Sequence, residues 1–180
     1  MTEEAETIRR VLAGDVDSFR LLVERHQQSV FRLAGGLLRD PHACEDVAQE
    51  TFLSAYRNLR LFDPQRARFA TWLLTIARNL CLNAARKKVP IPLGHLPERP
   101  VGGTPYDELA EKEWMDHLDR TLEALPPAQR TAFVLAEFLE LPYEQIARIE
   151  RTKVATVRAN ASKARKRLRS LLRQFSGGCT

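Results

Sequence analysis

A proline- and glycine-rich segment divides this chain into two parts. The stretch VPIPLGHLPERPVGGTPYDE, from Val89 to Glu108, holds five of the ten prolines and three of the eight glycines. Proline removes a backbone donor and fixes φ, so no helix continues through this segment. A segment of 20 residues is too long for a turn inside one compact domain. We therefore predict a linker at 89–108 between domains at 1–88 and 109–180.

Both flanking parts predict helices and no strands, so the expected fold class is all-α. Glycine is scarce, whereas Ala, Leu, Arg and Glu are abundant, and 44% of the residues are apolar, enough for a packed core. No run alternates apolar and polar residues as a half-buried strand does. Apolar spacing and helix stop signals predict helices at 3–13, 15–39, 42–59, 69–87, 109–125, 127–139, 143–150 and 154–172. The pair Gly35-Gly36 is a weak point in the second of these helices.

The positive charge of the chain is concentrated in its last helix. Nine Lys or Arg and no Asp or Glu lie between Arg151 and Thr180, although the formal net charge of the whole chain is only +5. A short helix at 143–150, a brief turn RTK and a longer basic helix form the helix-turn-helix pattern. This arrangement predicts a localised contact with a polyanion, and the alternative is a solvated charged surface.

The basic helix carries an apolar stripe that leaves its charged residues free. Val154, Val157, Ala161, Ala164, Leu168 and Leu171 recur every three or four residues and should pack on the preceding helix. The first part of such a helix enters the major groove of DNA, where side chains reach base edges or phosphates. The candidate DNA-reading residues of this helix are Arg158, Asn160, Ser162, Lys163, Arg165 and Lys166.

Four motifs, in this order along the chain, resemble those of bacterial sigma factors. EDVAQETFLSAYRNL (Glu45 to Leu59) resembles the core-polymerase-binding helix, and FATWLLTIARNLCLNAARKK (69–88) resembles the helix that melts and reads the −10 element. LPPAQRTAFVL resembles the start of the last sigma domain, and LPYEQIARI with TVRANASKARKRL resembles the −35-reading helix-turn-helix. With two domains and no room for others, the chain is similar to the small extracytoplasmic-function (ECF) class.

The third predicted helix provides a candidate docking face. Asp46, Gln49 and Glu50 stand at i, i+3 and i+4, so they share one side of the helix. Such a polar face suits basic residues of a partner, and the alternative is a solvated acidic surface. The resemblance implies that core RNA polymerase is the partner, through the clamp coiled coil of β′, with the β flap as a further contact. It also implies an anti-sigma factor that masks these faces.

The fourth predicted helix and the loop before it mix aromatic and basic residues, a combination that suits single-stranded DNA. The resemblance implies that the loop from Phe62 to Phe69 supplies a pocket for an extracted base. It also implies that Phe62, Phe69, Asn79, Asn83 and Arg86 contact the −10 element of promoter DNA. The alternative is that the aromatic residues are core, which is the interpretation favoured for Trp72. In the helix-turn-helix, Arg151 replaces a turn glycine, which predicts a cost of roughly 1 kcal/mol at a left-handed position.

Two other functions compete with a sigma factor. A stand-alone helix-turn-helix regulator would bring a ligand pocket or receiver domain, and no strands for one are predicted. An enzyme is disfavoured because GxxxxGK[ST] and GxSxG are absent and no histidines fall at metal spacing. We expect no catalytic residue, metal or cofactor. The three cysteines, Cys44, Cys81 and Cys179, lack a CxxC pair, and no signal or membrane span is predicted, so we expect a cytoplasmic protein without direct membrane insertion.

Overall fold

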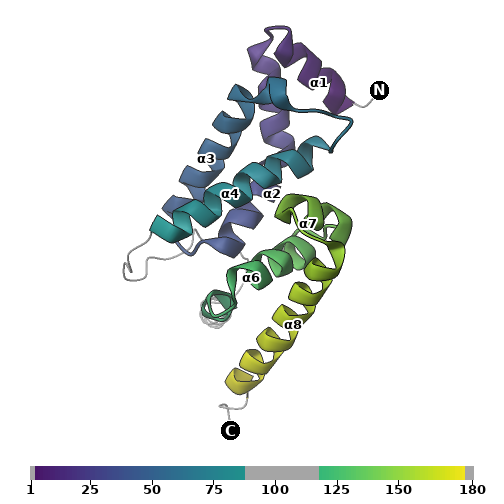
Figure 1. Cartoon of the computed structure of the whole chain (residues 1–180). Coiled ribbons are helices and arrows are strands. Elements are labelled where there is room, and N and C mark those ends of the chain that lie inside the picture. Colours follow the sequence, from purple (N-terminus) through teal and green to yellow (C-terminus); the bar gives the residue numbers. More distant parts are fainter. Residues whose placement is uncertain (1–2, 88–117, 177–180) are drawn as a thin grey trace.

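The computed structural model describes residues 3–87 and 118–176, and every regular element in those ranges is a helix. The all-α prediction is therefore confirmed for the described part of the chain. The first domain contains α1 (Glu3–Leu12), α2 (Phe19–Leu37), α3 (Pro41–Arg57) and α4 (Phe69–Lys87), with the 3-10 turns η1 (Val16–Ser18) and η2 (Leu59–Leu61) between them. Figure 1 draws this domain in purple to teal.

Local capping explains where these helices begin and end. Asp15 accepts a hydrogen bond from the Ser18 amide at 3.2 Å, so the predicted second helix begins as the separate turn η1. Asp40 accepts from the His42 amide at 3.1 Å, and Pro41 follows at the first helical position of α3. The predicted third helix ends at Arg57 because Asn58 leaves helical geometry and the chain continues as η2. The bounds of α4 are those predicted.

The second domain is also helical. Residues 118–123 are helical, and they are followed by α6 (Pro127–Phe133), the π-helical segment η3 (Val134–Phe138), α7 (Tyr143–Glu150) and α8 (Val154–Ser176). One helix was predicted at 127–139, but its second half widens into η3, where the Leu139 amide donates to the Val134 carbonyl at 3.3 Å. The predicted linker and most of the predicted helix at 109–125 lie outside the described residues.

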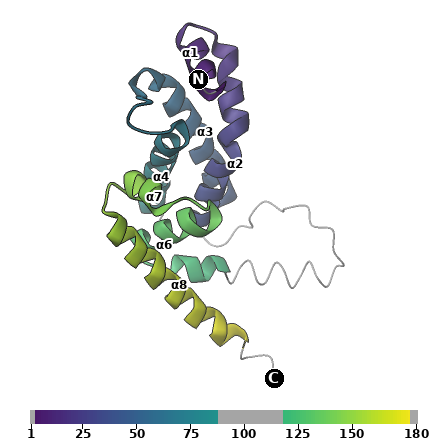
Figure 2. The ribbon, with the colours of Figure 1, turned by 90° about the vertical axis from the view of Figure 1, so that its right-hand side faces the viewer.

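The two domains pack against each other. Figures 1 and 2 place α6 and α7 beside α2 and α4, and η3 contacts α2. One cluster of buried side chains runs through both domains, from Leu33 and Ala77 in the first to Val134, Ile146 and Val157 in the second. A smaller cluster formed by Leu122, Leu125, Ala164 and Leu168 joins α8 to the segment before α6. The larger cluster therefore holds the two domains together, and the smaller one fixes the later part of α8.

Candidate functional site

The polar face predicted on α3 is exposed. The opposite side of the helix is buried through Val47, Ala48, Thr51, Phe52 and Ala55, which fixes the rotation of α3 about its axis. Asp46, Gln49 and Glu50 consequently point away from the core. Glu50 lies 3.8 Å from the Arg57 guanidinium, but both side chains remain half-exposed, so this ion pair is weak. The three residues form a surface that a basic partner can reach.

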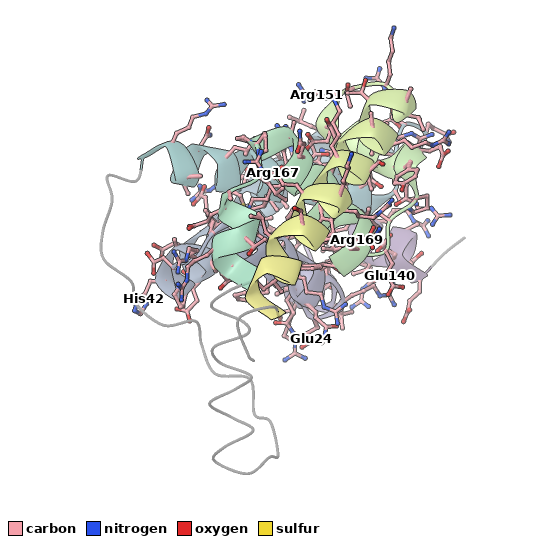
Figure 3. The ribbon with its side chains drawn as sticks, turned by 90° about the horizontal axis from the view of Figure 1, so that it is seen from below. Glu24, His42, Glu140, Arg151, Arg167 and Arg169 are labelled. Atoms are coloured by element: carbon pink, nitrogen blue, oxygen red, sulfur yellow. The ribbon has the colours of Figure 1, made fainter. Side chains whose placement is uncertain are left out.

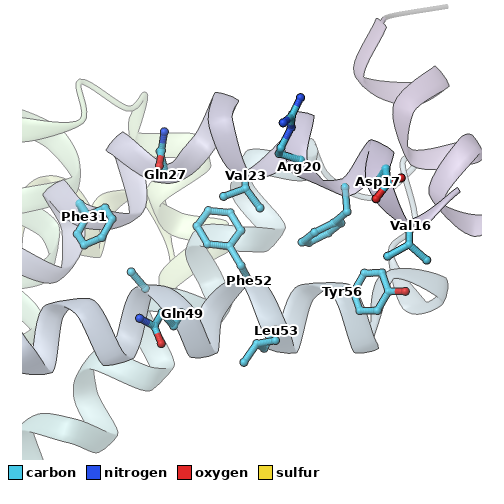
Figure 4. Close-up of a pocket in the computed structure, with 12 residues that line it drawn as sticks. Val16, Asp17, Arg20, Val23, Gln27, Phe31, Gln49, Phe52, Leu53 and Tyr56 are labelled. Carbon is cyan, nitrogen blue, oxygen red and sulfur yellow. The ribbon is translucent and has the colours of Figure 1, made fainter.

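An apolar groove lies beside this face, between α2 and α3, and the sequence did not reveal it. Its volume is about 890 Å³. Figure 4 shows Val23 and Phe31 of α2 across from Phe52 and Leu53 of α3, with Gln49 at the edge. Phe31, Leu53, Tyr56 and Val16 are large apolar side chains left exposed. These apolar residues lie outside the buried sides of α2 and α3. Their position off the helical apolar pattern is the sequence signal that could have indicated the groove. Together with Gln49, the groove makes a continuous mixed surface suited to a partner helix.

A second candidate face runs along α4. Asn79, Asn83 and Arg86 recur at i, i+4 and i+7, so they lie on one side of the helix, and all three are exposed. The opposite side is buried through Leu73, Leu74, Ala77 and Cys81. The neighbouring Arg78 donates from Nη1 to the Asn79 side-chain oxygen at 3.1 Å. Amide and guanidinium groups in such a row can hydrogen-bond bases and phosphates.

The structure places Phe62 and Phe69, the two aromatic residues predicted to contact the −10 element, in one aromatic cluster but exposes them differently. Phe69 is 1% exposed, and its ring contacts His26, Phe62 and Trp72 at centroid distances of 5.3, 5.5 and 5.7 Å. Its side chain belongs to the core and offers no surface to DNA in this conformation. Phe62 is half-buried at the edge of the same cluster. Trp72 packs on the core, in agreement with the favoured interpretation.

The helix-turn-helix predicted at the end of the chain is present. Arg151 adopts φ 51° and ψ 46°, the left-handed conformation expected there, and it ends α7. The Thr152 amide donates to the Ala147 carbonyl at 3.0 Å, and the Arg151 amide to the Arg148 carbonyl at 3.3 Å. These bonds satisfy the last carbonyls of α7 as in a Schellman-type cap. The turn is therefore formed without glycine.

Four members of the predicted apolar stripe of α8 are buried, namely Val157, Ala161, Ala164 and Leu168, and its two end members, Val154 and Leu171, are half-buried. Its other sides carry the charges, and Figure 3 shows Arg167 and Arg169 along the helix with Arg151 near its start. Of the predicted reading residues, the structure leaves exposed Arg158, Ser162, Lys163 and Lys166, and it half-buries Asn160. The Arg158 guanidinium lies 5.9 Å from the centroid of the Tyr143 ring.

Arg165 differs from the other basic residues of α8. Its Nε donates to Glu137 at 2.8 Å, and its Nη2 donates to the Tyr143 hydroxyl at 2.5 Å. The hydrogen bonds with Glu137 and Tyr143 raise the pKa of the Arg165 guanidinium. Arg165 thus ties α8 to α7 and to the end of η3 in this conformation.

The described residues offer no evidence for metal or thiol chemistry. Within them, no group of three or more His, Cys, Asp or Glu side chains could hold a metal ion. Cys44 and Cys81 are buried, and burial together with the nearby Cys44 raises the pKa of Cys81 to about 12. A thiol that stays protonated is a poor nucleophile. Cys179 lies outside the described residues.

Among the described helices, none is long and apolar enough to span a membrane.

Two helical domains, one ending in a helix-turn-helix, define a class of DNA-binding transcription factor. The sequence matches sigma-70 region 2 at residues 22–90 and sigma-70 region 4 at residues 115–168. The chain is 32% identical to the ECF RNA polymerase sigma factor SigW of Bacillus subtilis, over 93% of this chain and 96% of that protein. It is 36% identical to the ECF RNA polymerase sigma-E factor of Haemophilus influenzae, over 92% of each. The chain belongs to the ECF sigma factor family.

Solved structures share the fold over most of the chain. CnrH, solved in complex with the cytosolic domain of CnrY, superposes with a TM-score of 0.72 at 24% identity, covering 93% of this chain and 96% of that one. The sigma factor RpoE of Bartonella quintana, solved with the anti-sigma factor NepR, gives 0.71 at 23% identity, covering 86% and 96%. At these identities the likeness establishes the fold, and the two-domain all-helical architecture is confirmed.

Proposed function

We propose that this chain binds core RNA polymerase and directs promoter-specific transcription initiation. Residues 1–88 bind core polymerase and read the −10 element, residues 109–180 read the −35 element, and residues 89–108 connect them. The observation that carries the proposal is the match to sigma regions 2 and 4, in this order, on domains with separate polar and basic faces. The chain acts by binding alone, without covalent chemistry or a cofactor, in the cytoplasm where polymerase works.

The polymerase-docking surface consists of Asp46, Gln49 and Glu50 together with the groove between α2 and α3. A helical hairpin such as the β′ clamp coiled coil can place apolar side chains in the groove and basic ones against the two carboxylates. The support for this assignment is the continuity between Gln49 and the groove. The second domain would meet the β flap.

The promoter-reading residues lie on α4 and α8. For the −10 element we propose Asn79, Asn83 and Arg86, with Phe62 at the edge of the base pocket and Phe69 supporting it from the core. For the −35 element we propose Arg158, Asn160, Ser162, Lys163 and Lys166, with Arg165 holding α8 in place. Exposure of Asn79, Asn83 and Arg86 along one side of α4 supports the first assignment, and exposure of Arg158, Ser162, Lys163 and Lys166 outside the buried stripe of α8 supports the second.

We also propose control by an anti-sigma factor. RpoE was solved in complex with an anti-sigma factor, and CnrH with the cytosolic domain of CnrY. The exposed groove and the acidic face of α3 give such a protein a surface that excludes polymerase when it is covered.

Co-elution with bacterial core RNA polymerase in gel filtration tests the proposal. We expect the wild-type chain to co-elute. The Asp46→Ala, Glu50→Ala variant should bind core polymerase at least about tenfold more weakly, because two interfacial carboxylates are lost. A tenfold loss of affinity corresponds to about 1.4 kcal/mol of binding free energy. The matched control is Glu6→Ala, Glu24→Ala, which removes two exposed acids from α1 and α2 and should leave co-elution unchanged. A wild-type chain that stays free of core yet binds duplex DNA would be a stand-alone regulator instead.

A further inference from the structure

The contact between the two domains is closely fitted. Gly36 of α2 lies against η3 so tightly that a Cβ there would come within 2.6 Å of Val134 Cγ1 and 2.7 Å of Cγ2. Arg130 Nε donates to the Gly36 carbonyl at 2.8 Å. Burial lowers the pKa of the Arg130 guanidinium, and the carboxylates of Glu123 and Asp119 oppose this. A second polar contact joins Arg39 Nη1 to Glu123 at 3.0 Å.

The same contact includes the proposed −10 helix. Arg78 of α4 donates to both carboxylate oxygens of Glu150 on α7, at 2.8 Å from Nε and 3.1 Å from Nη2. The Glu150 side chain is only 7% exposed, and that of Arg78 is 22% exposed. Arg78 also donates to Asn79, which begins the exposed row on α4. A two-point guanidinium–carboxylate pair has the geometry with which arginine binds a phosphate.

This arrangement cannot read a promoter. The −10 and −35 elements are about 25 base pairs apart, which on B-form DNA is about 85 Å at 3.4 Å per base pair. In the structure α4 contacts α7, and α7 contacts the reading helix α8. Both reading faces therefore belong to one compact body, and the domains must separate before both elements can be bound on one duplex.

We propose that Glu150 substitutes for a DNA phosphate on Arg78, so that the α4–α7 contact is an autoinhibitory latch in the free chain. The inference rests on the proposed function, because it takes α4 as the −10 helix. Separation of the domains releases Arg78, which then contacts the DNA backbone beside Asn79. The exchange is balanced in charge, since one anionic partner replaces another. Arg78 is accordingly a further promoter-contacting residue that is hidden in the closed state.

The test compares three full-length variants. Glu150→Gln removes the charge that holds Arg78. Glu144→Gln makes the same charge change at an exposed position of the same helix. Arg78→Gln removes both the latch and the DNA contact. Two quantities are measured on the free proteins: the radius of gyration by small-angle X-ray scattering, and the affinity for a fluorescein-labelled single-stranded DNA of mixed sequence at several salt concentrations.

We expect Glu150→Gln to enlarge the radius of gyration and to bind the oligonucleotide about fivefold more tightly than Glu144→Gln, a difference of about 1 kcal/mol. Its log–log salt dependence should steepen by about 0.7, the value for one additional phosphate contact on a single strand. Arg78→Gln should enlarge the radius without a gain in affinity, and it tests opening independently if Glu150→Gln does not fold.

The latch would be overturned if Glu150→Gln and Glu144→Gln had equal affinities and radii, or if Arg78→Gln gained affinity like Glu150→Gln. These readouts use no polymerase, so they are separate from the co-elution test. If the wild-type chain co-elutes with core polymerase while Glu150→Gln keeps the wild-type radius and DNA affinity, the latch is rejected and the proposed function stands. If Glu150→Gln opens as expected but the wild-type chain never binds core polymerase, the proposed function is rejected, and the inference that Arg78 and Glu150 hold the free chain closed stands.

Discussion

Arg151 occupies a backbone conformation that favours glycine. Its φ of 51° is one of two positive values at non-glycine residues in the described chain, the other being 53° at Glu140. A Cβ in the left-handed region crowds the following carbonyl and costs roughly 1–2 kcal/mol. The sequence predicted this strain from the absence of a turn glycine. The Arg151 side chain is exposed, three residues before the start of the reading helix.

We expect Arg151→Gly to raise the free energy of unfolding by about 0.5–1 kcal/mol, because relief of the left-handed strain exceeds the extra entropy that glycine adds to the unfolded chain. Urea denaturation followed by circular dichroism measures the change. Arg148→Gly is the matched control. Arg148 is exposed inside α7, where glycine should destabilise by about 1 kcal/mol. Destabilisation of both variants would contradict the assigned backbone strain.

At the scale of the element, α8 combines packing and reading in one helix. Its buried stripe, Val157 to Leu168, fixes which side meets the core. Arg158 and Arg169 are 11 residues apart, close to three full turns, so they lie on nearly the same side, about 16 Å apart along the axis. Only the first part of a recognition helix reaches the bases. The two arginines therefore have the same charge and similar exposure, and they differ in their distance from the N-terminus of the helix.

Arg158→Ala should weaken binding of the holoenzyme to its promoter by about 1–3 kcal/mol and relax the base preference at one position of the −35 element. Arg169→Ala should change affinity by less than about 1 kcal/mol and leave base preference intact. A promoter fragment is first selected from a random-sequence library with the wild-type holoenzyme. Competition binding on this fragment then measures the affinity and the base preference of each variant. Equal losses of affinity and specificity in the two variants would refute an N-terminal reading position.

At the scale of the whole molecule, the contact between the domains distinguishes two adjacent glycines. A Cβ at Gly35 would meet nothing within 4 Å, whereas one at Gly36 would overlap Val134. Valine is branched at Cβ and cannot easily turn away. The sequence predicted Gly35-Gly36 as a weak point of a helix. In the structure, Gly36 instead permits the close approach of the second domain.

Gly35→Ala should raise the free energy of unfolding by about 0.5–1 kcal/mol through helix propensity alone. Gly36→Ala should lower it by about 1–3 kcal/mol, because it overpacks the contact with Val134. Thermal unfolding by differential scanning calorimetry measures both, and separation of the single transition into two in Gly36→Ala would report uncoupled domains. Equal stabilisation by the two changes would show that the domains do not pack in solution as they do here.

Local sequence determined the helices, their order and the helix-turn-helix. The bounds of α4 and α7, the exposed row Asp46, Gln49 and Glu50, and the buried stripe of α8 were all predicted, because helical periodicity and caps act over a few residues. Tertiary structure alone decided the groove beside Gln49, the burial of Phe69 and the pairing of Arg78 with Glu150, 72 residues away. Such contacts depend on how finished helices pack, and no short-range spacing in the sequence records which distant side chain will be the partner.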